Sequence, residues 1–220
     1  TSLYRTYRSN KVFLQDTIYL ERPLKLSDLN EEDVAAASAI LGWTDTGYCG
    51  EFRNPQTGRK GKIVMRISRI ASTDGYVLAI GCRGSLFDDF DKGDNYLFYY
   101  YSEKPTPVVR KLFFEYFEKD MSTGKYTRHI SFFPQGRGWV DKSGQLITQV
   151  ELVPGRCGYE FRYRISDGET RLTGAKADWN CDDDSLPESS WKEENIGRMR
   201  RQTSEVFDEV REFNEAVKKN

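Results

Sequence analysis

The sequence predicts a mainly β protein of the α+β class, in which an antiparallel meander closes into a barrel or half-barrel. The apolar content comes largely from aromatic residues, with 13 Tyr, 13 Phe and 4 Trp, and aromatic side chains are enriched in strands. From Tyr48 onward, apolar residues recur with period two and turn sequences interrupt them often. A chain of 220 residues is long enough for one substantial core. We therefore expect a single domain at 1–220, with a β-rich body at 1–187 and a helix at 188–218.

The N-terminal part of the chain predicts one strand and one short helix. The strand is "VFLQDTIYL" at 12–20. In 27–43, Ser27 or Asn30 suits an N-cap, acidic residues fill the first turn, and Gly42 stands where a C-terminal cap belongs. The alanines between these signals indicate a short helix that packs closely.

The middle of the chain predicts roughly nine or ten strands with short links, which favours a meander. The stretch 108–120 fits both the helical and the strand period, and its aromatic residues favour a strand. Closing such a sheet would remove its exposed edges. The expected strands are 62–70, 76–82, 96–102, 108–120, 126–133, 138–140, 145–153, 159–165 and 170–177.

The C-terminal part, after Pro187, predicts one long amphipathic helix. Its apolar residues recur at alternating steps of three and four, namely Ile196, Met199, Thr203, Val206, Val210, Phe213 and Val217. The resulting stripe is expected to cover an open face or end of the sheet. An alternative is that it pairs with its copy in a homodimer or binds another protein.

Charge, hydropathy and residue spacing exclude several functions. The 33 basic and 34 acidic residues are mixed along the chain, and no basic stripe suits nucleic acid. No apolar run approaches the roughly 18 residues of a membrane-spanning helix. His129 is the only histidine and no CxxC pair occurs, which argues against structural zinc. We therefore expect no metal and no cofactor.

The four cysteines leave two alternatives open. Two disulfides have three possible pairings, and a bond between Cys157 and Cys181 would close the hairpin between them. Four reduced, buried thiols are the other alternative. From Thr1 on, the sequence shows no Arg-rich presequence or apolar signal segment, which leaves open that a targeting segment was removed, and it contains no glycosylation sequon. The compartment stays open, and a mature exported or organellar protein is slightly favoured over a cytoplasmic one.

The stretch from 158 to 165 separates charged from aromatic side chains. Alternation along a strand places Glu160, Arg162 and Arg164 on one face and the aromatic residues between them on the other. In one interpretation the aromatic face is core and the charges face water. In the other, the two arginines meet the carboxylates of a ligand in a wide cavity, because guanidinium groups suit bidentate pairing.

A second aromatic stretch, "NYLFYYY" at 95–101, carries aromatic side chains on both faces. A strand buried between two layers would explain it, and a tyrosine-walled cavity for a planar ligand is the alternative. No catalytic residue is assigned. The ligand-binding candidates are Tyr99, Tyr101, Trp139, Glu160, Arg162, Tyr163 and Arg164.

The expected architecture resembles that of lipocalin-like carriers and of barrel-shaped lyases that transfer bilin chromophores to acceptor proteins. This resemblance concerns general architecture and transfers no residue. The first functional hypothesis is a non-catalytic carrier of a planar, apolar or amphipathic small molecule. The second is a lyase or isomerase in which Glu160 or Glu118 acts as an acid. The third is an adaptor or assembly protein that binds a protein partner through the C-terminal helix.

Overall fold

The computed structural model describes residues 17–24, 62–70, 75–83, 97–132, 134, 136–153, 156–181 and 190–218. The chain divides into two compact units, 1–112 and 113–220, and each is described by itself. The expected helix at 27–43 lies outside the described residues. No helix in the described ranges is long and apolar enough to cross a membrane. The expectation of a single domain stays a prediction.

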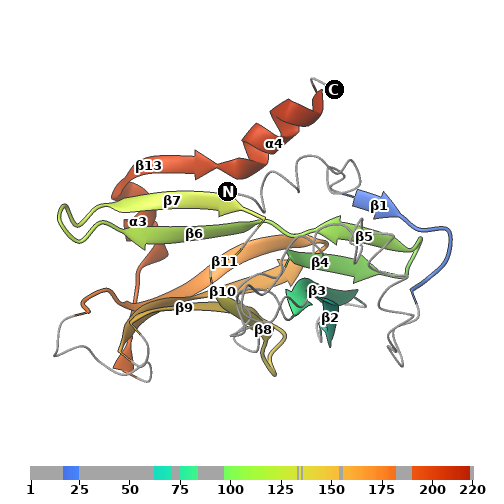
Figure 1. The fold of residues 1–220 in the computed structure, drawn as a ribbon, viewed down its shortest axis with the longest axis horizontal. Helices are drawn as coiled ribbons and strands as arrows, with labels where there is room; N and C mark the ends of the chain where they lie inside the picture. Colours follow the sequence, from blue (N-terminus) through green and yellow to red (C-terminus); the bar gives the residue numbers. More distant parts are fainter. Residues whose placement is uncertain are drawn as a thin grey trace. The chain divides into compact units, whose positions relative to one another are not determined.

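The first unit holds a five-stranded antiparallel sheet in the order β1-β5-β4-β3-β2 (Figure 1). Its buried centre is β4, where Tyr99 is 1% exposed and Tyr101 is fully buried. A Cβ atom on Gly75 would lie 2.3 Å from the ring of Tyr100, so a larger residue here would have to displace that ring. The strands are β1 (Thr17–Tyr19), β2 (Lys62–Arg69), β3 (Gly75–Arg83), β4 (Leu97–Ser102) and β5 (Val108–Lys111).

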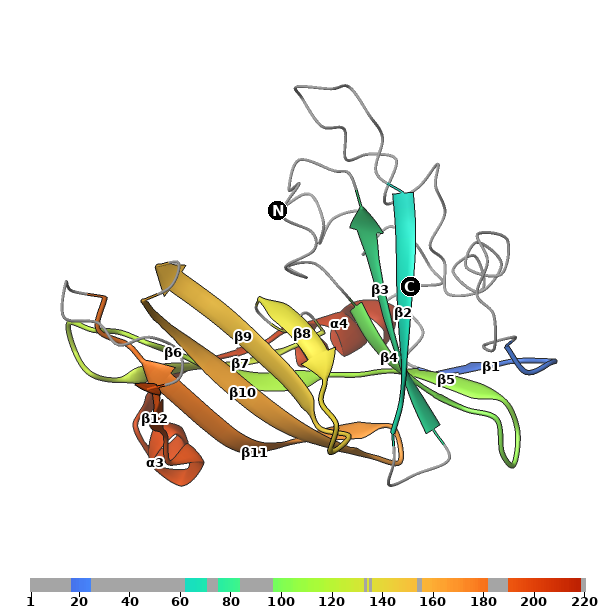
Figure 2. The same cartoon turned by 90° about the horizontal axis from the view of Figure 1, so that it is seen from below.

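The second unit contains a five-stranded sheet in the order β12-β11-β10-β9-β8 (Figure 2). The β10–β11 hairpin turns at Asp167 and Gly168, which both have positive φ. An Asp-Gly pair favours this two-residue turn. The strands are β8 (Arg137–Val140), β9 (Leu146–Val153), β10 (Cys157–Ser166), β11 (Glu169–Asp178) and β12 (Lys192–Glu193).

A three-stranded sheet in the order β13-β7-β6 forms the other layer of this unit. Strands β6 (Phe114–Lys119) and β7 (Tyr126–Ser131) pair antiparallel, whereas β13 (Thr203–Asp208) runs parallel to β7. The two layers meet through aromatic side chains: the ring centroid of Phe117 lies 6.5 Å from that of Phe161, and that of Phe114 lies 5.2 Å from that of Tyr163. The core of the unit is therefore aromatic.

The expected barrel is wrong, because the described strands form three sheets and none of these closes on itself. The chain leaves the first sheet after β5 and begins β6 at Phe114, which pairs only with β7 in the described part of the chain. Phe114 and Phe117 of β6 contact aromatic side chains of β10 instead of β6 pairing edge to edge with that sheet. Burial of aromatic faces between layers replaces closure as the way to remove apolar surface from water.

The long C-terminal helix is also wrong, because a strand divides it into two short helices, α3 (Ile196–Arg201) and α4 (Glu209–Lys218). Local capping explains the division. The hydroxyl of Thr203 donates to the carbonyl of Met199, and the carboxylate of Asp208 accepts from the backbone N–H of Arg211. Gln202 is the C-cap of α3, and Asp208 starts α4 as its N-cap. Between them, Val206 and Phe207 have high strand propensity and extend along β7.

Candidate functional site

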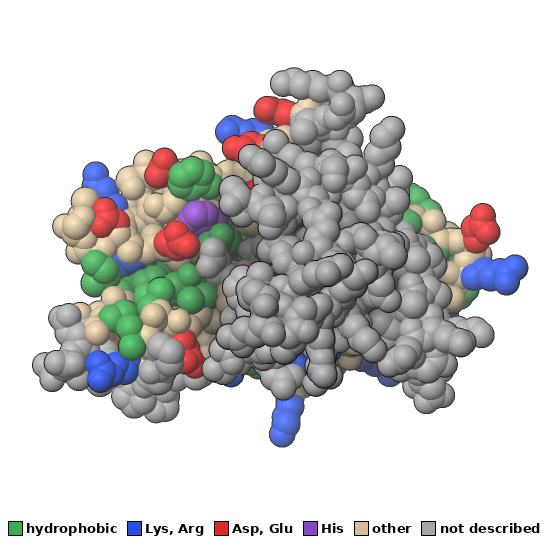
Figure 3. Space-filling model, in the orientation of Figure 1, with side chains coloured by type: hydrophobic (Ala, Val, Ile, Leu, Met, Phe, Trp, Pro, Cys, Tyr) green, Lys and Arg blue, Asp and Glu red, His purple; other side chains and the backbone are tan. Residues whose placement is uncertain are grey.

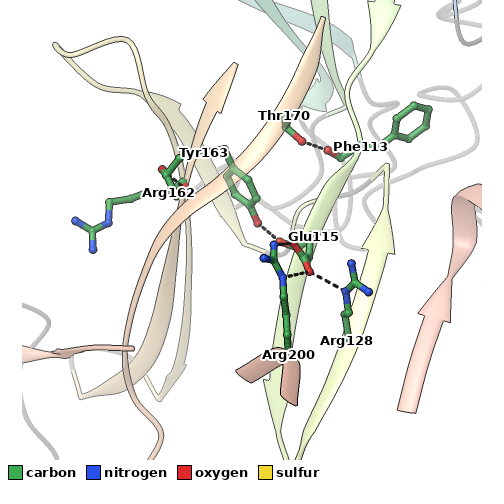
Figure 4. A network of polar contacts seen from close by, with 8 residues as sticks. Phe113, Glu115, Arg128, Arg162, Tyr163, Thr170 and Arg200 are labelled. Atoms are coloured by element: carbon green, nitrogen blue, oxygen red, sulfur yellow. Dashed lines mark hydrogen bonds and ion pairs between the residues drawn. The ribbon is translucent and has the colours of Figure 1, made fainter. Parts of the chain in front are cut away.

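Strand β10 separates an aromatic face from a charged one, as the sequence predicts. Tyr159, Phe161, Tyr163 and Ile165 are all at most 3% exposed. Arg162 and Tyr163 leave β10 on opposite sides (Figure 4). Arg164 is exposed. The charges do not simply face water, however, because Glu160 on the charged side is only 5% exposed.

Strand register places other polar side chains in line with Glu160. Residues directly opposite each other in antiparallel strands share a face. We call the following set, one residue per strand from β8 to β12, the polar row: Arg137, Gln149, Glu160, Lys176 and Glu193. The neighbouring row on the same face contains Trp139, Ile147, Arg162 and Gly174. Together these rows form what we call the polar face.

The charges of the polar face meet around Glu160 and Arg162. The carboxylate of Glu160 lies 3.2 Å from Lys176 Nζ and 3.8 Å from Arg162 Nε. Arg162 also donates through Nη2 to both carboxylate oxygens of Glu193 on β12. These ion pairs connect β10, β11 and β12 and hold the partly exposed Arg162 side chain across the sheet.

Gly174 makes room for this arginine. A Cβ atom at this position would lie 2.8 Å from Arg162 Nε and 3.0 Å from Cζ. The guanidinium group therefore lies over the glycine backbone of β11, where a side chain would displace it.

Gln149 is the least satisfied polar side chain of the polar face. It is 3% exposed, and its Nε2 has no hydrogen-bond partner among the described residues. Arg162 Nε, which is likewise buried, makes no hydrogen bond within these residues, although Glu160 lies at ion-pair distance. A buried N–H group without an acceptor costs about 1–3 kcal/mol. Two such donors on neighbouring rows indicate a place where an acceptor is missing.

The structure brings together three of the seven ligand-binding candidates, because Trp139, Glu160 and Arg162 belong to the polar face. Arg164 lies on the same side of β10, two residues beyond Arg162, and pairs with Arg171 outside these rows. Trp139 on β8 is 37% exposed, which leaves an indole surface open to contact. Sequence analysis missed Gln149 and Lys176, because only the pairing of β9 and β11 with β10 places them beside Glu160. Alternation along each strand gives the face of a residue but not its neighbour across the sheet.

The remaining candidates lie elsewhere. Tyr163 belongs to the aromatic face, where its hydroxyl donates to the carbonyl of Glu115 at 2.9 Å and burial raises its pKa well above the usual value. Tyr99 and Tyr101 belong to the first unit. The hydroxyl of Tyr101 accepts a hydrogen bond from the backbone N–H of Leu24 at 2.8 Å. The hydroxyl groups of Tyr163 and Tyr101 therefore each have a partner within the fold.

A second group of polar side chains lies on the β6–β7–β13 sheet. His129 stacks on Tyr116 with ring centroids 4.6 Å apart, and its Nε2 lies 3.1 Å from a Glu118 oxygen. The hydrogen bond from His129 lowers the pKa of Glu118 despite partial burial. Glu118 is therefore ionised at neutral pH, which suits an ion pair or a base better than the acid of the lyase hypothesis. Within the described ranges, no group of three or more His, Cys, Asp or Glu residues is placed to hold a metal ion.

Glu209, at the start of α4, is a buried carboxyl group that sequence analysis did not identify. Burial raises its pKa, and hydrogen bonds from Ser131 Oγ and the backbone N–H of Phe132 offset only part of this shift. The folded protein therefore binds a proton on Glu209 more tightly than the unfolded chain does. Stability falls as pH rises from the ordinary carboxyl pKa of the unfolded chain to the raised pKa of the folded protein.

We expect Glu209→Gln to raise the free energy of unfolding at pH 7, because the amide keeps an acceptor for Ser131 without a buried charge. The gain should disappear below about pH 4, where the carboxyl group is protonated in both states. Urea unfolding of parent and variant at pH 7 and below about pH 4 measures this gain in the free energy of unfolding. Glu215→Gln on the exposed side of α4 is the control. A Glu209→Gln variant less stable than the parent at pH 7 would contradict this account.

Comparison of the chain with protein-family models, with curated proteins and with solved structures finds no match. The function is therefore argued from the geometry of the polar face alone.

Proposed function

We propose that this protein binds a small amphipathic molecule on the polar face of the β8–β12 sheet, as a non-catalytic binding or carrier protein. The observation that carries the proposal is the buried amide of Gln149, whose Nε2 has no acceptor within the described residues. A ligand with a carboxylate, carbonyl or sulfonate group supplies that acceptor. This differs from the expected cavity inside a barrel, because the site lies on one face of a sheet that does not close on itself.

Arg162 Nε is the second donor available to the polar group of the ligand. Gln149 and Arg162 are diagonal neighbours on β9 and β10, so their Cα atoms lie about 7 Å apart. Arg162 Nε lies near Gly174 of β11, whereas Gln149 belongs to β9, so a ligand that meets both donors carries acceptor atoms at separate positions. Lys176, whose Nζ lies 3.2 Å from Glu160, adds positive charge on the other side. An anionic or strongly polar group is therefore favoured over an apolar one.

Trp139 provides the surface for the apolar part of the ligand. It stands on the same row as Arg162 but two strands away, across Ile147. Strand spacing makes that separation about 10 Å. A planar molecule of this length lies along the row with its ring on the indole and its polar group at Gln149 and Arg162.

The test is to replace the amide by an apolar side chain of similar size. We expect Gln149→Leu to raise the free energy of unfolding by about 1 kcal/mol, because it removes a buried donor without an acceptor. The same variant should weaken binding of anilinonaphthalene sulfonate, a planar probe with an acidic group, as measured by fluorescence titration. Structural residues lose stability on substitution, so a gain in stability together with a loss of binding identifies a ligand-binding residue.

Gln202→Leu, an identical substitution at the exposed end of α3, is the matched control and should leave probe binding unchanged. Native mass spectrometry of the parent, purified without denaturation, adds a direct search for a bound molecule. The proposal fails if Gln149→Leu binds the probe as tightly as the parent does, or if it is clearly less stable than the parent.

A further inference from the structure

We infer that the outer edge of β13 is a docking site for an extended, basic segment of another protein, which adds to the β6–β7–β13 sheet as a further strand. This surface lies in a different sheet from the polar face, and the inference does not depend on the proposed ligand.

The first argument is the open edge. In the described part of the chain, β13 pairs with β7 on one side only and ends the sheet. Figure 1 shows it as the outermost strand of its layer. An edge strand presents unpaired N–H and C=O groups, and another strand can pair with them.

The second argument is the exposure of apolar side chains on this edge. Val206 and Phe207 are each 50% exposed. Because they are neighbours in a strand, their side chains point to opposite faces of the sheet. Phe207 also continues the aromatic stack of Tyr116 and His129, with its ring centroid 5.5 Å from that of His129. Hydrophobic and acidic side chains surround the histidine on the surface (Figure 3). Both faces of an added strand would therefore meet apolar surface at β13.

The third argument is charge, which selects the partner. From Glu205 to Glu215 the chain carries one basic residue, Arg211. Of the acidic residues, Glu205 and Asp208 lie on β13 and Glu212 and Glu215 are exposed on α4, whereas the carboxyl group of Glu209 is turned to Ser131. A second copy of this chain would bring two such sets of carboxylates together, which is unfavourable. A strand that alternates basic and apolar residues complements both the charge and the exposed side chains, so the acidic edge also excludes other strands.

The experiment uses the full chain and a short peptide of alternating lysine and valine, with a peptide of alternating glutamate and valine for comparison. We expect only the basic peptide to bind, with an affinity that falls as salt is raised. Hydrogen exchange should show new protection of backbone amides within 203–208, because strand addition pairs them. Isothermal titration calorimetry gives the affinity.

Glu205→Lys should weaken binding of the basic peptide about tenfold, because it replaces attraction by repulsion opposite the added strand. Glu169→Lys makes the same charge change at an exposed position of β11 and should leave the affinity unchanged. If both variants weakened binding equally, the net charge of the protein would explain the effect and the inference would be overturned. Binding without new protection in 203–208, no binding of the basic peptide, or self-association of the parent through β13 would each overturn it as well.

Discussion

Removing the disulfide between Cys157 and Cys181 is expected to lower the free energy of unfolding by about 3 kcal/mol. Cys157 begins β10 and Cys181 follows the end of β11, with Cα atoms 5.2 Å apart and a sequence separation of 24. The bond holds the open end of the β10–β11 hairpin, opposite its turn at Asp167 and Gly168. Without it, the unfolded chain gains the freedom that this loop had lost.

The measurement compares urea unfolding of the parent with that of the double variant Cys157→Ala and Cys181→Ala. Cys157 is fully buried, so the alanine variant also loses packing. The parent unfolded under reducing conditions keeps the sulfur atoms and isolates the effect of the bond. Adding reductant to the double variant, which keeps Cys49 and Cys82, measures any effect of the reductant on these two cysteines. Parent and double variant with equal free energies of unfolding would show that the bond contributes nothing.

Most of the strands could be predicted from the sequence, because each depends on local alternation and a nearby turn. The hairpin of β10 and β11 follows from the Asp-Gly turn. The ambiguous stretch 108–120 proved to be β5 and β6, as its aromatic residues indicated. The pairing of Cys157 with Cys181 was one of the alternatives and is confirmed. In each case the deciding contacts lie close in sequence.

The arrangement of those strands depends on contacts that are distant in sequence. The sequence does not show that β6 leaves the first sheet, or that 203–208 pairs with β7 instead of continuing a helix. The stripe from Ile196 to Val217 has a valid helical period. Three residues oppose it: Gln202 ends α3 as its C-cap, Asp208 starts α4 as its N-cap, and the ring of Phe207 stacks on that of His129. Tertiary pairing overrides helix propensity there.

In the candidate site, too, some features follow from the local sequence and others depend on contacts that are distant in sequence. Alternation correctly placed Glu160, Arg162 and Arg164 on one face, whereas the burial of Glu160 depends on cross-strand neighbours. Gln149 and Lys176 become visible only through register, because a shift of one residue in β9 or β11 would turn them to the aromatic face. A polar residue inside a strand pattern, such as Gln149 between Thr148 and Val150, is the only signal that the sequence offers.

Glu115→Gln is expected to lower the free energy of unfolding by about 2 kcal/mol at pH 7. Glu115 connects three elements of the second unit, because its carboxylate accepts from Arg128 Nε on β7 at 2.7 Å and from Arg200 Nε on α3 at 3.0 Å (Figure 4). Its side chain is 15% exposed. The amide of glutamine keeps the size of the side chain but offers one acceptor atom and no charge to two guanidinium groups.

The pH dependence separates this ion-pair effect from a packing effect. Burial alone would raise the pKa of Glu115, but the hydrogen bonds and charges of Arg200 and Arg128 outweigh burial and hold it below the usual value. A lowered pKa contributes stability that is present above the ordinary carboxyl range and is lost as pH falls through the folded-state pKa. The parent and Glu115→Gln should therefore converge in acid. A difference that persists unchanged in acid would assign the effect to packing.

Glu151→Gln provides the matched comparison. Its partner is Arg137, with the two groups 3.0 Å apart, and both side chains are about one-third or more exposed. An exposed pair contributes about 0.5 kcal/mol or less. We therefore expect the Glu115 variant to lose several times more stability than the Glu151 variant in the same buffer. Equal losses would mean that joining β6, β7 and α3 through one carboxylate adds nothing beyond an ordinary surface ion pair.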